Sequence, residues 1–211
     1  MTAIPFIKPV HYPESDGKPM AETDVHRREM FDLIGTLDDR FRDAPDVYVA
    51  GNLFLYYAEG NPRKVVAPDV FVVKGVPKGN RRIYKLWEER HAPCLVIELT
   101  SDSTRQEDLE AKKECYARLG VEEYFLHDPL GDYLEPPLQG LRLEEGRYRQ
   151  IVPAPDGSLE IRTLGLRIRK EGEQSRLIDA ATGESLLRPE EAYAKIRLLQ
   201  EELARLKRST S

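Results

Sequence analysis

Cysteine, histidine and long apolar runs are scarce in this sequence, and each shortage excludes a class of protein. The two cysteines, Cys94 and Cys115, lie within apolar runs without the spacing of paired ligands, so neither a disulfide framework nor a cysteine metal site is expected. The four histidines show no metal-pair spacing, which argues against a histidine zinc site. No apolar run reaches about 18 residues, and no signal-peptide pattern occurs. We therefore expect a cytoplasmic protein with no membrane association.

The residues that are present fit one globular domain with short extensions. With 211 residues, 40% hydrophobic and 33% charged, the chain is long enough to bury one core and has a wet surface. Residues 1–22 are rich in proline, glycine and charge, and we expect them to form an arm. We expect residues 23–187 to form the domain and residues 188–211 to form a C-terminal helix.

Hydrophobic periodicity predicts both helices and strands in the domain. Apolar residues spaced three and four apart predict a helix that Thr23 or Asp24 caps and that ends near residues 43–45. Alternation after Gly131 predicts antiparallel hairpins that extend a sheet with one wet face. The other expected elements are strands over 47–50, 53–57, 65–73, 83–87, 94–99 and 122–127, a helix over 104–120, and short strands at 177–178 and 185–187.

Positive charge is concentrated in one segment of an acidic chain. The net charge of −5 argues against a protein that coats nucleic acid, yet residues 61–90 carry 8 basic and 3 acidic side chains. A local basic surface beside a carboxylate site is what a phosphodiester substrate needs, which makes Lys74, Arg81 and Arg82 candidate substrate-binding residues. A solvated loop of mixed charge is the alternative.

Pro68 and Asp69 interrupt the apolar run 65–73. Proline is best tolerated at a sheet edge, a strand start or a bulge, where a ladder hydrogen bond is already missing. A break at this point would leave the Asp69 carboxylate pointing away from regular strand pairing. An ordinary Pro-Asp turn is the alternative.

Glu98 and Lys112 are charged residues in places where the pattern predicts burial. Residues 94–99, CLVIEL, form the most continuous apolar strand, and an acid within it is costly unless it is paired or binds a metal. Lys112 projects near the middle of the inward stripe of the next helix, which Asp108 flanks, whereas Lys113 lies about 100° away. The stripe consists of Leu109, Cys115, Tyr116 and Leu119. A structural Glu98–Lys112 ion pair, or a snorkelling lysine, is the alternative.

The chain has no Walker loop and no GxGxxG, GxSxG or CxxC motif, so its candidate chemistry rests on these acids and the lysine. Asp69, Glu98 and a backbone carbonyl such as that of Leu99 can hold Mg²⁺, with Mn²⁺ as a substitute. The metal activates a water and neutralises phosphate charge, and Lys112 orients that water or stabilises the transition state. This pattern predicts a Mg²⁺-dependent endonuclease. Whether Glu22, Glu29 or Glu59 completes the metal site stays open.

The region from Gly51 to Pro129 resembles the Uma-type family of restriction-endonuclease-like proteins, in the PD-(D/E)xK nuclease superfamily. The matching segments are APDVFVVKGV at 67–76 and LVIELTSDSTRQEDLEAKKECYARLGVEEYFLHDP at 95–129, with weaker similarity in the hairpins after residue 140. The resemblance implies an α/β (α+β) core with a central mixed sheet flanked by helices, and nucleic acid, with DNA favoured over RNA, as the partner.

The resemblance also implies roles for individual residues. Asp69 matches the Asp of the PD motif, and Glu98 matches the second acid. The superfamily lysine stands two residues after that acid, where this chain has Thr100, and Lys112 matches a lysine that has moved to the following helix. The departure at Thr100 and the apolar heptads of residues 192–206 motivate a second hypothesis. It is a non-catalytic nuclease-fold module that binds protein or nucleic acid and assembles through the C-terminal helix, with the trio as a structural charge network.

The C-terminal segment carries a pattern for self-association. Pro189 stands near the first position of the expected helix. Apolar residues there step by four, three, four and three, which predicts a short coiled coil or a helix docked on the body. The residues are Ala192, Ile196, Leu199, Leu203 and Leu206. We expect a homo-oligomer, most simply a dimer.

Overall fold

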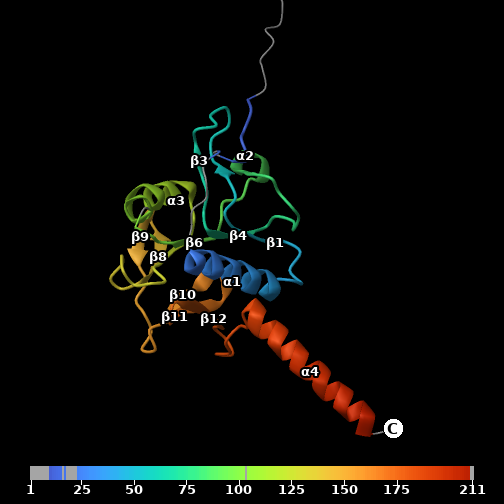
Figure 1. Ribbon diagram of the computed structural model, residues 1–211. Helices are drawn as coiled ribbons and strands as arrows, with labels where there is room; N and C mark the ends of the chain where they lie inside the picture. The colour runs from blue at the N-terminus through green and yellow to red at the C-terminus, as the bar shows by residue number, and fades with distance from the viewer. Residues whose placement is uncertain (1–9, 16, 18–22, 103, 210–211) are drawn as a thin grey trace, which may run out of the picture.

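The computed structural model describes residues 10–15, 17, 23–102 and 104–209. Within them the chain forms a six-stranded mixed sheet in the order β1-β4-β6-β7-β8-β9 (Figure 1). The pair β6–β7 is parallel and the other four pairs are antiparallel. The strands are β1 (Val47–Ala50), β4 (Val70–Lys74), β6 (Leu95–Leu99), β7 (Glu123–His127), β8 (Leu138–Glu144) and β9 (Arg147–Gln150). The expected α/β architecture with a central mixed sheet is therefore confirmed.

The two faces of the sheet pack against two separate cores, because alternate residues of a strand point to opposite faces. In β6, Leu95, Ile97 and Leu99 belong to one cluster, whereas Val96 belongs to the other. All five residues of β6 are buried, as the run CLVIEL predicts for a strand that is covered on both faces. Glu98 shares the face of Val96.

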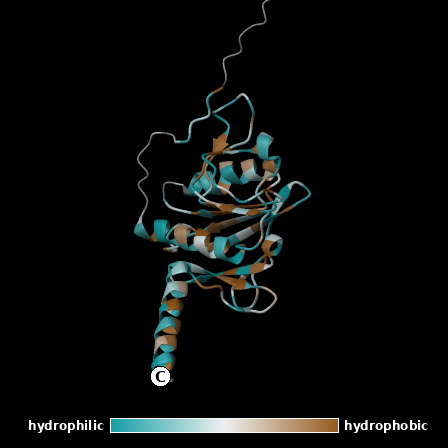
Figure 2. Cartoon of the chain, turned by 90° about the vertical axis from the view of Figure 1, so that its right-hand side faces the viewer, coloured by the Kyte–Doolittle hydropathy of each residue, from teal (hydrophilic) through white to brown (hydrophobic). Residues whose placement is uncertain are grey.

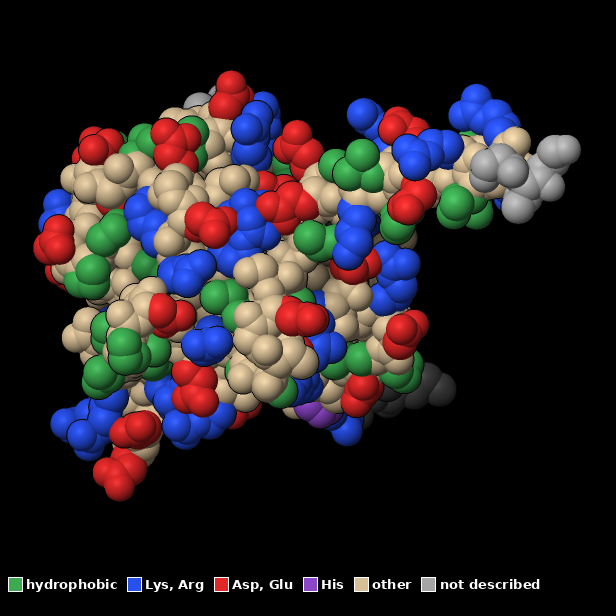
Figure 3. All heavy atoms as spheres, turned by 90° about the horizontal axis from the view of Figure 1, so that it is seen from below, with side chains coloured by type: hydrophobic (Ala, Val, Ile, Leu, Met, Phe, Trp, Pro, Cys, Tyr) green, Lys and Arg blue, Asp and Glu red, His purple; other side chains and the backbone are tan. Residues whose placement is uncertain are grey.

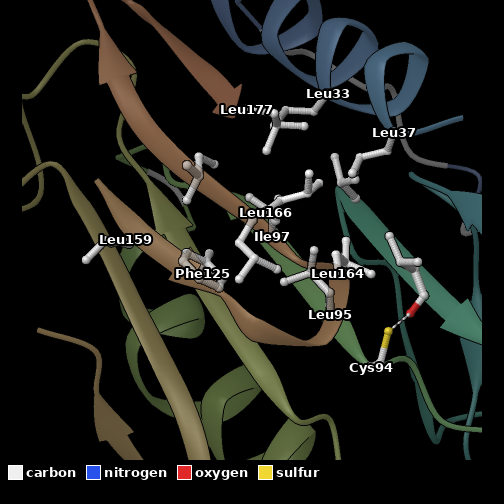
Figure 4. Packing of buried hydrophobic residues seen from close by; sticks show 14 of the residues in the cluster. Leu33, Leu37, Cys94, Leu95, Ile97, Phe125, Leu159, Leu164, Leu166 and Leu177 are labelled. Carbon is white, nitrogen blue, oxygen red and sulfur yellow. Dashed lines mark hydrogen bonds between the residues drawn. The ribbon is translucent and has the colours of Figure 1, made fainter. Parts of the chain in front are cut away.

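Helix α1 (Asp24–Arg40) and a small antiparallel sheet cover the first face (Figure 1). Thr23 caps α1, since its hydroxyl oxygen accepts a hydrogen bond from the His26 N–H at 3.1 Å. Leu33 and Leu37 of α1 lie over Ile97 and Leu166 of the sheets (Figure 4). The small sheet consists of β10 (Leu159–Ile161), β11 (Leu166–Glu171) and β12 (Gln174–Asp179), with a 3-10 turn at Arg162–Leu164 between the first two.

The hairpin prediction holds in part. Strands β8 and β9 extend the central sheet as expected, but β10, β11 and β12 form a sheet of their own. Its apolar side chains pack onto the central sheet, so the wet face points away from the core. The strand expected at 185–187 is reduced to one bridge between Ile178 and Ser185.

The second face is covered by a helical segment and another small sheet. The segment begins with a π-helix, Glu107–Lys112, and continues as α3 (Lys113–Leu119), which ends at Gly120 in a left-handed conformation with φ 79°. The small sheet has the order β3-β2-β5. Its strands are β2 (Leu55–Tyr56), β3 (Val65–Val66) and β5 (Tyr84–Lys85), and the strand expected over 83–87 turns after two residues into α2 (Leu86–Glu89).

The C-terminal helix α4 (Pro189–Ser209) projects from the body (Figure 1). Its turns carry apolar and polar side chains in alternation along the whole length (Figure 2). None of the helices in the described ranges combines the length and apolar character of a bilayer span. Most of the predicted N-terminal arm, residues 1–22, lies outside the described residues.

Candidate active site

The strand pairing brings Asp69 and Glu98 together at one end of the central sheet. Strands β4 and β6 are antiparallel, with Val70 opposite Ile97, so the residue before Val70 lies beside the residue after Ile97. The Asp69 N–H donates to Glu98 Oε2 at 3.3 Å, and the Leu99 N–H donates to Asp69 Oδ2 at 2.7 Å. The two predicted acids therefore share one hydrogen-bonded unit.

The interruption between strands β3 and β4 at Pro68 holds Asp69 in this position. The predicted run 65–73 divides into β3 and β4 on either side of it, and the Asn52 N–H donates to the Pro68 carbonyl at 2.8 Å. Gly51 permits the close approach, because a Cβ there would lie 2.0 Å from the Asp69 carbonyl oxygen and 2.6 Å from Ile34 Cδ1. Any side chain at position 51 would push against the backbone of Asp69.

Lys112 reaches the acids from the end of the π-helix. Its Nζ lies 3.1 Å from Glu98 Oε2 and 2.9 Å from Asp108 Oδ1, with 13% of the lysine side chain exposed. On the other side, the Tyr116 hydroxyl donates to Glu98 Oε1 at 2.6 Å. The π-helix, a rare form that is frequent at functional sites, thus supplies both Asp108 and Lys112.

Burial and mutual charge set the ionisation of this cluster. Glu98 is fully buried, and burial raises its pKa to about 8; the charges of Asp69 and Asp108 add to the rise, while Lys112 opposes it. Burial likewise raises the pKa of Asp108. Burial works against ionised Asp69, but the His26 hydrogen bond and the Lys112 charge hold its pKa below the ordinary value. Burial works against charged Lys112 as well, yet its acidic neighbours raise the pKa of the ammonium.

Three residues of the cluster around Asp69, Glu98 and Lys112 were not predicted as site residues from the sequence. His26 has its Nε2 3.5 Å from Asp69 Oδ1 and a side chain only 12% exposed, although its place in the first turn of α1 favours a capping or surface role. Tyr116 fits the inward stripe as a core residue, and its hydroxyl gives no signal in the pattern. Asp108 stands one turn before Lys112, and that i, i+4 spacing is the one signal that points to it.

None of the three candidates for a third metal-binding acid is placed in the cluster by the described residues. Glu22 lies outside the described residues. Glu29 is fully buried, but it accepts from the Ser175 N–H at 2.9 Å and lies 3.3 Å from His127 Nδ1. Glu59 is exposed. The acid that joins the cluster is Asp108 instead.

The predicted substrate-binding residues lie apart from one another. Lys74 is at the far end of β4, roughly 16 Å along the strand from Asp69, and binds the Thr163 carbonyl. Arg81 pairs with Glu89 at 2.6 Å and covers the Tyr48 ring at 4.1 Å. Arg82 is 82% exposed and pairs with Glu14 at 2.6 Å. Each of the three therefore has a partner within the chain.

Carboxylate oxygens are the donor type that a hard divalent cation prefers. The side chains of Glu98 and Asp108 contact the Lys112 ammonium, and the Asp69 carboxylate accepts from the Leu99 N–H beside them. Among the described residues, no group of three His, Cys, Asp or Glu side chains is arranged as a metal site. Two carboxylates and the Leu99 carbonyl suit Mg²⁺, which commonly keeps several water ligands.

The family model Uma2, "Putative restriction endonuclease", matches residues 6–170. The chain belongs to this family. A solved structure with the same fold is that of "a putative nuclease belonging to DUF820" from Anabaena variabilis, with 14% sequence identity and a TM-score of 0.50. The similarity covers 72% of this chain and 81% of that one. No curated protein matches the chain.

Family membership confirms the resemblance predicted from residues 67–76 and 95–129. The description of the family as "Putative restriction endonuclease" implies nucleic acid as its substrate class. Nucleases of the PD-(D/E)xK type commonly use divalent metals.

Proposed function

We propose that this chain is a Mg²⁺-dependent endonuclease that hydrolyses phosphodiester bonds in DNA at Asp69, Glu98 and Lys112. The carrying observation is that Glu98 Oε2 lies 3.1 Å from Lys112 Nζ and accepts from the Asp69 backbone N–H at 3.3 Å, which brings two acidic residues and one ammonium together at one end of the sheet. The side chains of Lys112 and Asp69 are 13% and 16% exposed, whereas Glu98 is fully buried, so these two groups are the ones through which the cluster reaches the surface.

The roles follow from the chemistry of each group. Asp69, Glu98 and the Leu99 carbonyl would hold Mg²⁺ or Mn²⁺, which would supply an activated water and neutralise charge on the phosphate. Lys112 carries a fixed positive charge beside them, suited to the negative charge that develops on a phosphate oxygen. His26 and Tyr116 position the carboxylates of Asp69 and Glu98, respectively.

Arg82 is the best placed of the predicted basic residues to contact the phosphate backbone, because most of its side chain is exposed. Lys74 and Arg81 remain candidates that would have to exchange their internal partners for phosphate. Contacts of this kind add affinity without sequence preference, and they weaken as the salt concentration rises.

The test is Mg²⁺-dependent cleavage of DNA by the wild type and by Asp69→Ala and Glu98→Ala. We expect both variants to lose cleavage while retaining the circular dichroism spectrum of the wild type. Glu59→Ala, which removes an exposed acid, is the matched control and should cleave normally. Retained cleavage in both site variants would sink the proposal.

A second candidate function is a non-catalytic module in which the trio is a structural charge network. Two observations favour it: Glu98 is fully buried with protein donors on both carboxylate oxygens, and Thr100 replaces the superfamily lysine. Under this reading Glu98→Gln mainly alters stability, since breaking a buried pair costs about 3–5 kcal/mol. A lower melting temperature for Glu98→Gln together with a wild type that never cleaves would favour the module.

A further inference from the structure

Helix α4 carries an apolar stripe that is half exposed to solvent. Four large side chains of the stripe are half exposed: Ile196 50%, Leu199 54%, Leu203 53% and Leu206 58%. The space-filling view shows hydrophobic side chains between charged ones along the projecting helix α4 (Figure 3). A lone helix in water gains little stability, and most helices depend on packing of an apolar face. The stripe is therefore a surface on which a second apolar helix can pack.

The base of α4 is fixed to the body, so the helix has a defined direction. A Cβ at Gly35 of α1 would lie 2.6 Å from Pro189 Cγ, which shows how closely the two helices approach. Glu191 accepts from Arg176 Nη1 at 2.6 Å and Nη2 at 2.7 Å, and from the Arg188 N–H at 2.9 Å. A cleft of about 500 Å³ between α1 and α4 is lined by Ile196 and Leu199, so the stripe begins at this joint.

The stripe has the heptad register of a two-stranded coiled coil. In that register Ile196 and Leu203 take a positions, and Leu199 and Leu206 take d positions. β-branched residues at a with leucine at d favour a parallel pair. The register places Glu202 at g and Lys207 at e, on the two flanks of the seam.

The flanking charges select one orientation. In a parallel pair, g of one helix meets the following e of the other, which sets Glu202 against Lys207 of the second copy, twice by symmetry. In an antiparallel pair with the stripe in register, g meets g, which sets Glu202 against Glu202 of the second copy. The other parallel contact, between Lys195 and Gln200, is neutral.

We infer that α4 docks a second copy of this chain as a parallel, in-register helix pair. The two bodies then lie at the same end of the pair, because both helices begin at the body. This inference does not depend on the proposed nuclease activity.

Charge exchange on the full chain tests the orientation, with molar mass measured by light scattering across a dilution series. The wild type is expected to be a dimer. Glu202→Lys and Lys207→Glu should each raise the dimer dissociation constant about tenfold, because each replaces two attractions by two repulsions. The double variant should return the dissociation constant to near the wild-type value. Failure of the double variant to do so would overturn the parallel register.

Cysteine cross-linking is a second test of the helix orientation, and its result does not depend on the dimer affinity. Leu206→Cys places a thiol opposite itself in a parallel pair, whereas an antiparallel pair sets it opposite Ile196. Mild oxidation should therefore link two chains of Leu206→Cys covalently. The native thiols of Cys94 and Cys115 are buried, so wild-type protein is the control and should not be linked. A monomeric wild type at every concentration, or unlinked Leu206→Cys, would contradict the inference.

Discussion

Two glutamates in the described part of the chain, Glu98 and Glu29, have no exposed surface, and they lie in clusters of different character. Glu98, on the α3 face of the central sheet, shares its oxygens with Lys112, Tyr116 and the backbone of Asp69. Glu29, in α1 on the opposite face, binds Ser175 of β12 and lies beside His127 of β7. Both carboxylates are buried within the same domain.

Access to solvent and balance of charge distinguish the two clusters. Around Glu98 the side chains of Lys112 and Asp69 are 13% and 16% exposed, and the carboxylates of Glu98 and Asp108 both contact the Lys112 ammonium. Around Glu29 the His127 side chain is fully buried, and a single acid meets one imidazole and one serine. The first arrangement is the one to which we assign the proposed cation and substrate. The second joins α1 to two strands, so burial of an acid alone does not mark a site.

The largest expected effect separates Lys112 from its neighbour. Lys112→Ala should lower the cleavage rate about 100- to 1000-fold, the usual loss when one preorganised electrostatic group is removed. Lys113→Ala, the same substitution one residue later, should leave the rate within about twofold of the wild type. Single-turnover cleavage at saturating Mg²⁺ measures both. Equal rates for the two variants would mean that Lys112 has no catalytic role.

The Glu29 cluster should respond in stability instead of activity. Glu29→Ala removes the acceptor of Ser175 and leaves His127 buried without its carboxylate, so we expect a loss of about 3 kcal/mol in the free energy of unfolding. Urea unfolding gives this value, and cleavage per folded molecule should stay unchanged. A stable Glu29→Ala protein that has lost cleavage would place Glu29 in the site.

A smaller effect tests the support beneath Asp69. Gly51→Ala puts a methyl group against the Asp69 carbonyl and Ile34, and we expect about 2 kcal/mol of destabilisation from the crowding. Because the strain falls on the backbone of a proposed ligand, cleavage should drop as well. Gly146→Ala is the control: alanine is strained there by the φ of 76°, but no atom lies within 4 Å of the added methyl group. Equal cleavage by the two variants would show that the contact with Asp69 is unimportant.

A pH-dependent effect, gradual rather than abrupt, concerns the proton on Glu98. Its pKa is about 8 in the folded protein and near 4.5 when unfolded, so folding takes up a proton between these values. The stability that this proton provides is complete below pH 4.5 and is lost as the pH rises through 8, by at most about 1.4 kcal/mol per pH unit. Urea unfolding of metal-free protein should show this slope, and Glu98→Gln should lack it. Parallel profiles would contradict the raised pKa.

Sequence patterns predict most of the elements but not the way they meet. The break at Pro68 and the inward direction of Lys112 are local properties, readable from proline chemistry and a helical wheel. The contact between Asp69 and Glu98 requires the antiparallel pairing of β4 with β6, which no local pattern specifies. The π-helix has the residue preferences of an ordinary α-helix, so the sequence predicts only a helix there.

Long-range contacts explain the remaining differences. His26 is 43 positions before Asp69 in the chain, and only the path of α1 across the sheet brings them within 3.5 Å. Glu29 has its partner Ser175 146 positions away. Neither contact produces a recognisable spacing in the sequence. The sequence therefore offered Glu29 as a candidate ligand but could not show that Glu29 lies outside the site.

Metal titration tests the contrast between the two clusters most directly. Calorimetry with Mn²⁺ on the wild type, Asp69→Asn and Glu29→Gln compares two matched replacements of an acid by its amide. The account predicts that the wild type and Glu29→Gln bind Mn²⁺ and that Asp69→Asn does not. Undiminished binding by Asp69→Asn, or loss of binding in a folded Glu29→Gln protein, would contradict the assignment of the metal to the Asp69–Glu98 cluster.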